Sequence, residues 1–324
     1  MKVFVAGATG AIGRPLIAAL LGAKHDVIGM ATRLEGVNLV RDRGAEGLIL
    51  NALDAGAVQA EIARIRPDVI IDELTSLPKS YTPEEMRIAA PRDRRLRLEG
   101  GGNLHRAALQ TGVKRYIVQS TGFFDGRGQG LASENEPLAF DATPGVAGSV
   151  AVYTQLEARV LGSAGMEGVA LRYGFFYGRG TYHDPENGSI AEQLRERQYP
   201  VIEPATGVSS FIHVEDAAAA TVSALEVRPG AYNIVDDDPA TLAVWLPAFA
   251  AFVGAPTPPH LSEAEALRAG GPDAVYYATQ LRGASNRKAK SEFGFAPRPL
   301  EWLRARDRSD SVTRSTYERS TRSA

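Results

Sequence analysis

The chain has 324 residues, 44% of them hydrophobic, which is enough to bury at least one large core, and we expect two lobes. Its 36 basic and 38 acidic side chains give a formal net charge of -2, so the composition favours neither nucleic acid nor an anionic membrane as a partner. Cysteine is absent, which excludes disulfides, thiolate metal sites and a cysteine nucleophile, and the five histidines show no metal-ligand spacing.

The N-terminal stretch lacks the pattern of a targeting segment, and no run of about 18 apolar residues is present that could cross a membrane. The simplest interpretation is a cytoplasmic protein that acts on a small-molecule substrate. Residues 305–324 are polar and rich in Ser, Thr and Arg, and we expect them to form a flexible tail.

Short apolar segments alternate with helical ones through residues 1–175. Segments of helical periodicity, such as 14–25, separate most of the apolar runs, as right-handed crossovers between parallel strands require. This alternation predicts an α/β fold with a doubly wound parallel sheet. The six predicted strands are 2–7, 26–33, 47–54, 67–74, 113–121 and 166–174.

The pattern changes after Gly174, where proline, glycine and aromatic residues become frequent. A helical segment at 189–198, a mixed segment at 209–226 and a strand-like segment at 230–236 follow. We expect residues 176–304 to form mainly a smaller substrate-binding lobe, with segments that return to the first domain.

The stretch "VFVAGATGAIGRPLIAAL" places Gly7, Gly10 and Gly13 between the first strand and the first helix. Glycine lets the backbone turn tightly, approach a pyrophosphate and pack the helix against the sheet, while the helix N-terminus offers free N–H groups to phosphates. The spacing G-x-x-G-x-x-G differs from the more common dinucleotide fingerprint, but its place between strand and helix predicts a dinucleotide site. We assign Thr9, Ala11, Ile12 and Arg14 to the same site.

The end of the second strand bears on the choice of cofactor. An acidic residue there would hold the ribose 2′-hydroxyl of NAD, whereas this chain has Thr32 and Arg33. A guanidinium suits a 2′-phosphate, so NADP(H) is favoured over NAD(H), unless Arg33 is merely solvated. Asp54 could reach the adenine, and Leu74 and Thr75 after the fourth strand complete the predicted cofactor site.

Over residues 1–300 the sequence resembles the extended or atypical short-chain dehydrogenase/reductases, the group that contains the NAD-dependent epimerases and dehydratases. The resemblance rests on several separate segments in the order that this family uses. It implies a Rossmann-type domain with a small C-terminal substrate lobe. The segments are "GATGAIG", "LRYGFFYGRGT", "FIHVEDAAAATVSALE", "AYNIVDDDPA" and "ASNRKAKSEFGFAPR".

The resemblance also implies an active site made of a Ser or Thr after the fifth strand and a Tyr-x-x-x-Lys pair on the next helix. Thr121, next to Ser120, matches the Ser/Thr position. In the family a glutamate follows the lysine by four residues, and here Glu157 stands 15 residues before Arg172, as that glutamate would. This register puts Tyr153 at the lysine position and Ser149 at the tyrosine position. Anchoring on Tyr153 as the tyrosine puts Glu157 at the lysine position, so neither register supplies the pair.

Without the lysine, a tyrosine of pKa about 10 is only about 0.1% ionised at neutral pH and is a poor base, but it remains a hydrogen-bond donor. We therefore expect an NADP(H)-dependent oxidoreductase or epimerase-like enzyme, acting on a carbonyl or alcohol of a small metabolite or sugar nucleotide, with Thr121 and Tyr153 polarising the oxygen. The alternatives are a redox-neutral lyase, isomerase or cyclase, or a non-catalytic nucleotide sensor. Tyr153 could instead belong to a buried apolar stripe.

Two further features allow two interpretations each. Tyr173 stands where the family has a proline near the nicotinamide, and it either contacts the cofactor or fills space. The basic run containing Arg92, Arg94, Arg95 and Arg97 either reaches a substrate anion or forms a solvated or oligomer-contacting face. Since neighbouring helices form dimer interfaces in many relatives, a homodimer is expected.

Overall fold

The structure, a computed structural model, describes residues 1–304. Its centre is a seven-stranded parallel sheet in the order β11-β6-β5-β4-β1-β2-β3. This is the doubly wound order that the alternation of apolar and helical segments predicts, so the predicted fold class is confirmed. The strands are β1 (Lys2–Ala6), β2 (Asp26–Ala31), β3 (Glu46–Ile49), β4 (Val69–Asp72), β5 (Arg115–Thr121), β6 (Glu167–Tyr173) and β11 (Gly230–Ile234).

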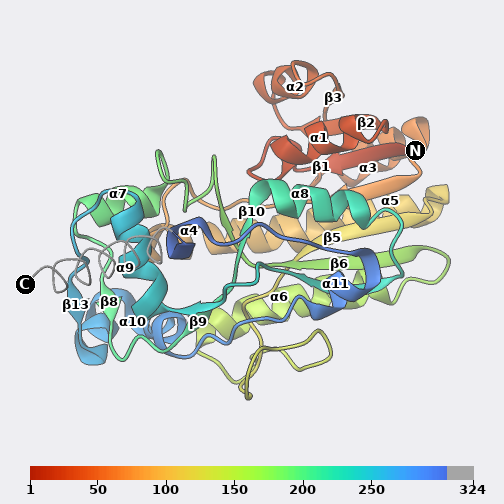
Figure 1. Cartoon of the computed structure of the whole chain (residues 1–324). Coiled ribbons are helices and arrows are strands. Elements are labelled where there is room, and N and C mark those ends of the chain that lie inside the picture. Colours follow the sequence, from red (N-terminus) through yellow and green to blue (C-terminus); the bar gives the residue numbers. More distant parts are fainter. Residues whose placement is uncertain (305–324) are drawn as a thin grey trace, which may run out of the picture.

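Helices cover both faces of the sheet, which explains why the central strands are apolar runs rather than alternating ones. Side chains from α1 and α8 pack against one face, and those from α3, α5 and α6 pack against the other (Figure 1). α2 packs beside β2 and β3. These helices are α1 (Gly13–Gly22), α2 (Leu34–Arg41), α3 (Ala55–Ile65), α5 (Gly101–Thr111), α6 (Pro144–Leu161) and α8 (Val214–Ser223).

Two segments from beyond residue 175 lie with the sheet domain. β11 pairs in parallel with β6, and α11 (Arg287–Phe293) packs against β11. The chain therefore leaves the sheet domain after β6, builds part of the second lobe, and comes back to add the last strand.

The second lobe gathers at one end of the molecule, on the left in Figure 1. Its core contains Trp245, Phe249 and Trp302. The Phe249 ring packs edge to face with that of Trp302, and the Phe211 ring packs edge to face with those of Trp245 and Trp302. Short strand pairs connect this core to the sheet domain. The elements are β7 (Phe175–Tyr177) with β10 (Phe211–His213), β8 (Val201–Ile202) with β13 (His260–Leu261), β9 (Val208–Ser209) with β12 (Ala240–Thr241), and the helices α7 (Ser189–Arg195), α9 (Leu242–Phe252) and α10 (Glu263–Thr279).

The connection from β4 to β5 contains an irregular helix. It begins as α4 (Pro83–Arg95), whose N-terminus is capped by the Thr82 hydroxyl, and continues as the single π-helical turn η1 (Leu96–Gly100) before α5. π-Helical turns are rare and frequently occur at functional sites. The π-helical turn therefore makes the β4–β5 connection a candidate functional segment.

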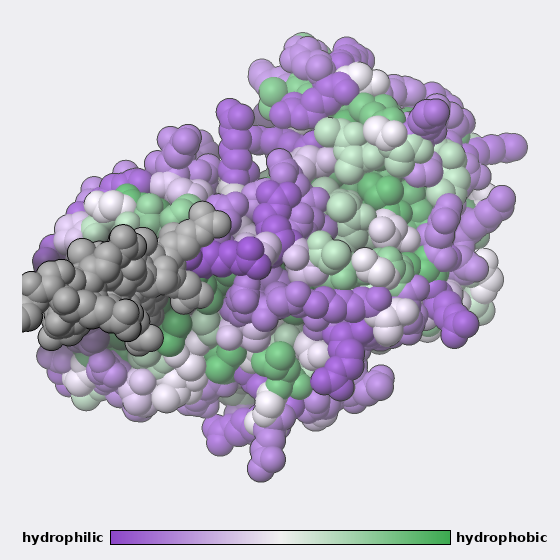
Figure 2. Space-filling view, viewed as in Figure 1, coloured by the Kyte–Doolittle hydropathy of each residue, from purple (hydrophilic) through white to green (hydrophobic). Residues whose placement is uncertain are grey.

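No helix among residues 1–304 is long and apolar enough to cross a membrane. On the face seen in Figure 2, hydrophilic residues cover much of the surface and apolar residues form smaller patches between them. The predicted tail, 305–324, lies outside the described residues. Cytoplasmic localisation and the homodimer stay predictions.

Candidate active site

The glycine loop between β1 and α1 has no space for side chains. Gly7 has a φ of +81°, and a Cβ there would lie 2.4 Å from the carbonyl oxygen of Glu73. A Cβ on Gly13 would lie 2.3 Å from the Gly7 carbonyl oxygen. Gly10 is less crowded, with the Gly7 carbonyl oxygen at 3.2 Å from its Cβ position, and it is exposed. The loop therefore offers bare backbone at the start of α1, the shape that a pyrophosphate requires.

The N-terminus of α1 also suits an anion. Its N-cap residue, Ile12, makes no side-chain cap, and the first turn contains no acidic residue that would compete for the positive end of the helix. Arg14 is exposed, and its Nε donates to the Thr9 carbonyl oxygen at 3.0 Å, which keeps the guanidinium beside the loop. Ala11 lies half-buried in the same turn. These residues fit a dinucleotide phosphate.

The ends of β2 and β3 carry the residues predicted to meet the adenosine half. Thr32 and Arg33 directly follow β2 and are exposed. Asp54 is exposed too, and its Oδ1 accepts a hydrogen bond from the Ala57 N–H at 3.0 Å. One oxygen of Asp54 is therefore engaged as the N-cap of α3, a role that the adenine hypothesis did not include.

A buried carboxyl group after β4 lies against the glycine loop. Glu73 is 3% exposed, its Oε1 accepts from the Tyr173 hydroxyl at 3.1 Å, and its Oε2 has no hydrogen-bond partner in the described part of the chain. Burial raises the pKa of Glu73 to about 8. Leu74, buried, and Thr75, half-buried, continue along this edge. Sequence reasoning missed Glu73, whose only signal is a charged residue directly after an apolar strand.

Tyr173 lies in the core of the sheet domain. Its side chain is 1% exposed, and its hydroxyl lies 2.6 Å from the Thr221 Oγ as well as near Glu73. Burial raises the pKa of Tyr173 well above its ordinary value. Of the two interpretations of this residue, its packing favours the space-filling one.

Glu157 anchors α6 to the sheet. Its carboxylate accepts from the Arg172 Nε at 2.8 Å and Nη2 at 2.6 Å, and from the Ser120 hydroxyl at 2.6 Å. The glutamate is 7% exposed, so this bidentate ion pair is largely shielded from water. Since Glu157 is held by β5 and β6, it is not free to act beside a cofactor.

The other candidate catalytic residues lie in three different environments. The Ser149 hydroxyl donates to the Gly145 carbonyl oxygen at 3.1 Å within α6. Tyr153, one helical turn further along, is half-buried and packs against apolar clusters on both sides. Burial raises the pKa of Tyr153, and nearby Arg97 only partly offsets this. Thr121, at the end of β5, has a buried hydroxyl that makes no hydrogen bond within residues 1–304.

The basic run divides into two kinds of residue. Arg92, Arg94 and Arg95 are exposed, as expected of a solvated face. Arg97 is 4% exposed, and its Cζ lies 5.1 Å from the centroid of the Tyr153 ring. The sequence named Arg97 only as one member of this run. It did not predict that Arg97 alone is buried, because that burial depends on a contact with α6, far along the chain.

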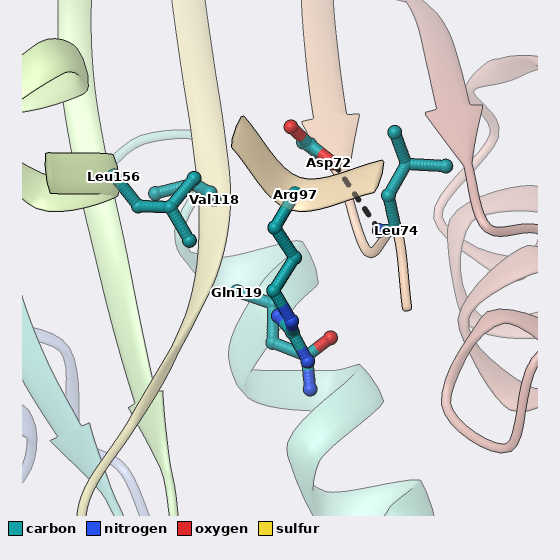
Figure 3. A pocket seen from close by; sticks show the side chains of 6 residues that line it. All are labelled: Asp72, Leu74, Arg97, Val118, Gln119 and Leu156. Carbon is teal, nitrogen blue, oxygen red and sulfur yellow. Dashed lines mark hydrogen bonds between the residues drawn. The ribbon is translucent and has the colours of Figure 1, made fainter. Parts of the chain in front are cut away.

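Arg97 also lines a narrow crevice that is partly open to solvent (Figure 3). The pocket lies near the carboxyl ends of β4 and β5, where open α/β sheets bind their ligands. Its other lining residues are Asp72, Leu74, Val118, Gln119 and Leu156. Within residues 1–304, no group of three or more His, Asp or Glu side chains is arranged to hold a metal ion.

Comparison with known proteins agrees with this architecture. Residues 3–235 match the model of the NAD dependent epimerase/dehydratase family. The chain is 37% identical over 312 residues to a 3-diazoavenalumate denitrifying reductase from Streptomyces sp, covering 93% of this chain and 98% of that protein.

Two solved structures share the fold. The UDP-glucose 4-epimerase of Thermotoga maritima, solved with UDP-glucose, aligns with a TM-score of 0.71 at 18% identity, over 94% of this chain and 96% of that one. The UDP-glucose 4-epimerase of Thermus thermophilus, solved with NAD, aligns with a TM-score of 0.70 at 24% identity, over 93% and 95%. The chain thus belongs to the NAD-dependent epimerase/dehydratase family and is an NAD(P)-dependent oxidoreductase or epimerase.

Proposed function

We propose that the protein is an NADPH-dependent reductase that works without the Tyr-x-x-x-Lys pair. The observation that carries this proposal is the ion pair between Glu157 and Arg172. It supports the register in which Tyr153 occupies the lysine position and Ser149 the tyrosine position. In the other register, the lysine position is Glu157 itself. In both registers α6 offers a phenol and no ammonium group.

The preference for NADPH rests on the end of β2. Arg33 is exposed directly after the strand, and neither it nor Thr32 is acidic; the nearest carboxylate along the chain is that of Glu35 in the first turn of α2. A free guanidinium favours a 2′-phosphate over a 2′-hydroxyl. Arg14, held beside the glycine loop, adds a second positive charge for the phosphates. The residues that we assign to the dinucleotide are Gly7, Thr9, Gly10, Ala11, Ile12, Gly13, Arg14, Thr32, Arg33, Asp54, Leu74, Thr75 and Tyr153.

The chain's own groups favour reduction over oxidation. Because burial raises the pKa of Tyr153, this phenol stays protonated at neutral pH and can donate a hydrogen bond but not remove a proton. The Thr121 hydroxyl, which has no hydrogen-bond partner among residues 1–304, is a second donor at the end of β5. Both suit a substrate that accepts a hydride and needs no strong acid or base. Ser149 and Tyr173 are engaged within the protein and have at most a supporting role.

A diazo compound meets that requirement. The Streptomyces relative is, by its name, a denitrifying reductase of 3-diazoavenalumate, and we propose the same class of substrate here. An arenediazonium ion that receives a hydride from NADPH yields the arene and N₂, and the oxidised product is NADP⁺. The acceptor is already cationic, so the residues around it need only orient it and exclude water.

The aromatic residues beside α6 suit a flat substrate. The Phe124 ring lies 6.3 Å from that of Tyr153 and 5.9 Å from that of Tyr277, measured between centroids. Phe123 stacks on Phe175 at 4.1 Å with only 15° between the ring planes. These rings come from the sheet domain and from the second lobe, so they supply apolar, planar surface where the two meet.

The test is NADPH oxidation, followed by nicotinamide absorbance, with an aryl diazo compound as acceptor. We expect turnover with the diazo compound that exceeds turnover with simple ketones and sugar nucleotides, and faster turnover with NADPH than with NADH. Arg33→Ala should lower the ratio of kcat/KM for NADPH to kcat/KM for NADH about 10-fold or more, because the substitution removes a charge-assisted contact with the 2′-phosphate. Turnover of ketones or sugar nucleotides alone would favour the carbonyl or alcohol reaction, and substrate conversion without NADPH oxidation would favour a redox-neutral enzyme.

A further inference from the structure

Arg97 is a buried cation that the reaction as proposed does not use. We propose that Arg97 binds the nicotinamide-ribose half of the dinucleotide, supplying from η1 the positive charge that is missing at the lysine position of α6. This inference rests on the proposed function for the presence of a dinucleotide, and it concerns a different half of that molecule from Arg33.

The guanidinium is fixed on two sides. Its Nε donates to the Asp93 Oδ2 at 2.8 Å, and its Cζ lies over the Tyr153 ring. The Asp93 Oδ1 in turn accepts from the Ser76 N–H at 2.5 Å, so the same carboxylate holds the segment that follows β4. The position of Arg97 is therefore coupled to α6 and to the edge of the sheet where the predicted cofactor residues Leu74 and Thr75 lie.

The two Nη atoms of the Arg97 guanidinium remain free to donate hydrogen bonds to a ligand, as far as residues 1–304 are concerned. No hydrogen bond among residues 1–304 uses either Nη of Arg97, although the side chain is almost fully buried. Neither Nη is among the fully buried side-chain atoms in the described part of the chain that lack a partner, so both keep some exposure through which the acceptors of a ligand could reach them. In Figure 3 the side chain extends along the pocket that Asp72, Leu74 and Val118 help to form. Hydroxyl oxygens of a bound ribose would satisfy these donors.

The location agrees with the path of a dinucleotide. The glycine loop touches the segment after β4 through the close approach of Gly7 to Glu73. The Arg97 pocket lies at the end of that same strand and extends to β5, which ends in Thr121. A dinucleotide with its phosphates on the glycine loop and its reactive end near Thr121 and Tyr153 would bring its second ribose between them.

An arginine is suited to this position. Its charge persists when it is buried, and its planar group can lie over an aromatic ring, donate to Asp93 and keep further N–H groups for a ligand. A lysine on α6 would carry one ammonium group at the end of a flexible chain. The observed arrangement places the cation on the neighbouring helix and fixes it with a carboxylate.

The test measures binding of two nucleotides to the Arg97→Met variant by calorimetric titration. NADPH carries the nicotinamide ribose, whereas adenosine 2′,5′-bisphosphate lacks it. We expect Arg97→Met to weaken NADPH binding about 10- to 100-fold and to leave the bisphosphate affinity within about 2-fold of the wild type, since only the first ligand loses charge-assisted hydrogen bonds. Arg97→Lys should recover part of the NADPH affinity.

Matched variants separate this role from a structural one. Arg94→Met removes an exposed arginine of α4 and should leave both affinities unchanged. Equal weakening of both ligands by Arg97→Met would mean that the residue only supports the fold, and no weakening of NADPH would mean that it does not contact the cofactor; either result overturns the inference. Arg33→Ala should weaken both ligands. A wild type that binds NADH as well as NADPH would contradict the proposed cofactor preference while leaving the Arg97 assignment testable with NADH.

Discussion

Tyr153 is surrounded by groups that keep its phenol neutral. Burial raises its pKa, the Arg97 guanidinium lowers it, and Asp93 raises it again. In the family, the lysine beside the catalytic tyrosine lowers the pKa of that tyrosine, as Arg97 does for Tyr153 here. Asp93, however, pairs with the Arg97 guanidinium and weakens this effect. The cation beside Tyr153 is therefore partly neutralised by Asp93, and it lowers the pKa of the phenol less than an unpaired lysine would.

Glu73 gives the protein a specific dependence of stability on pH. Its pKa in the folded protein is about 8, above its ordinary value of 4.5, so the folded state favours the neutral carboxyl group. The contribution of Glu73 to the free energy of unfolding is therefore greatest below about pH 4.5, and it is lost as the pH rises towards about 8. Above that pH the buried carboxylate is charged, with one oxygen that has no partner in the described residues.

The Glu73→Gln variant tests this prediction, because glutamine resembles the neutral acid and does not ionise. Urea unfolding should give similar free energies of unfolding for variant and wild type near about pH 5, and a growing advantage for the variant up to about pH 8 or 9. A constant difference between the two proteins across this range would show that Glu73 does not titrate abnormally.

At the residue scale, the sequence is most informative where two residues stand at a fixed distance along the chain. The spacing of Glu157 and Arg172 predicts a register for α6, and the structure pairs these two side chains. The roles that this register assigns to Ser149 and Tyr153 stay predictions. Glu73 was missed and Arg97 was not distinguished from the other arginines of its run, because burial is what sets both residues apart. Arg97 is buried by Tyr153 and Glu73 by the glycine loop, and no local pattern in the sequence records these contacts.

Among the elements, the parallel strands could be predicted and the turn η1 could not. The strands are short apolar runs that end at glycine or polar residues, and burial on both faces makes such runs necessary. The helical part of the β4–β5 connection contains Pro91, which disfavours a helix interior, and nothing in its sequence distinguishes an α-helical from a π-helical turn. The π turn is the feature that carries Arg97.

The glycine loop allows a prediction at the level of one strand–turn–helix unit. Gly13→Ala should destabilise the fold by several kcal/mol, because its Cβ would lie 2.3 Å from a backbone oxygen that cannot move without displacing α1. Gly10→Ala should fold with a melting temperature close to that of the wild type, since its Cβ would meet one atom at 3.2 Å. It should nevertheless lose most NADPH affinity, because the methyl group covers the bare backbone.

Thermal unfolding with and without NADPH measures both effects. The ligand should raise the melting temperature of the wild type but not that of Gly10→Ala. If NADPH stabilises Gly10→Ala as strongly as the wild type, the loop does not hold the phosphates in the way that we propose.

Over the whole molecule, the sheet domain is built from two separate parts of the sequence. β11 and α11 return from beyond the second lobe to complete the sheet, so the lobe is an insertion between β6 and β11 and an extension after it. The aromatic cluster between α6 and α10 lies where these parts meet. Under our proposal, substrate choice would depend on irregular segments whose packing the sequence does not reveal. The proposed cofactor site lies on regular strand–helix units, which the sequence does reveal.

We propose that the protein transfers a hydride from NADPH to its substrate without a lysine on α6. The most direct measurement uses NADPH deuterated at the transferable position and an aryl diazo acceptor, with mass spectrometry of the arene and detection of N₂. We predict one deuterium in the arene for each N₂ released. An arene that carries only solvent hydrogen, or nitrogen release without NADPH oxidation, would contradict the claim and point to a reaction in which the nucleotide is not the reductant.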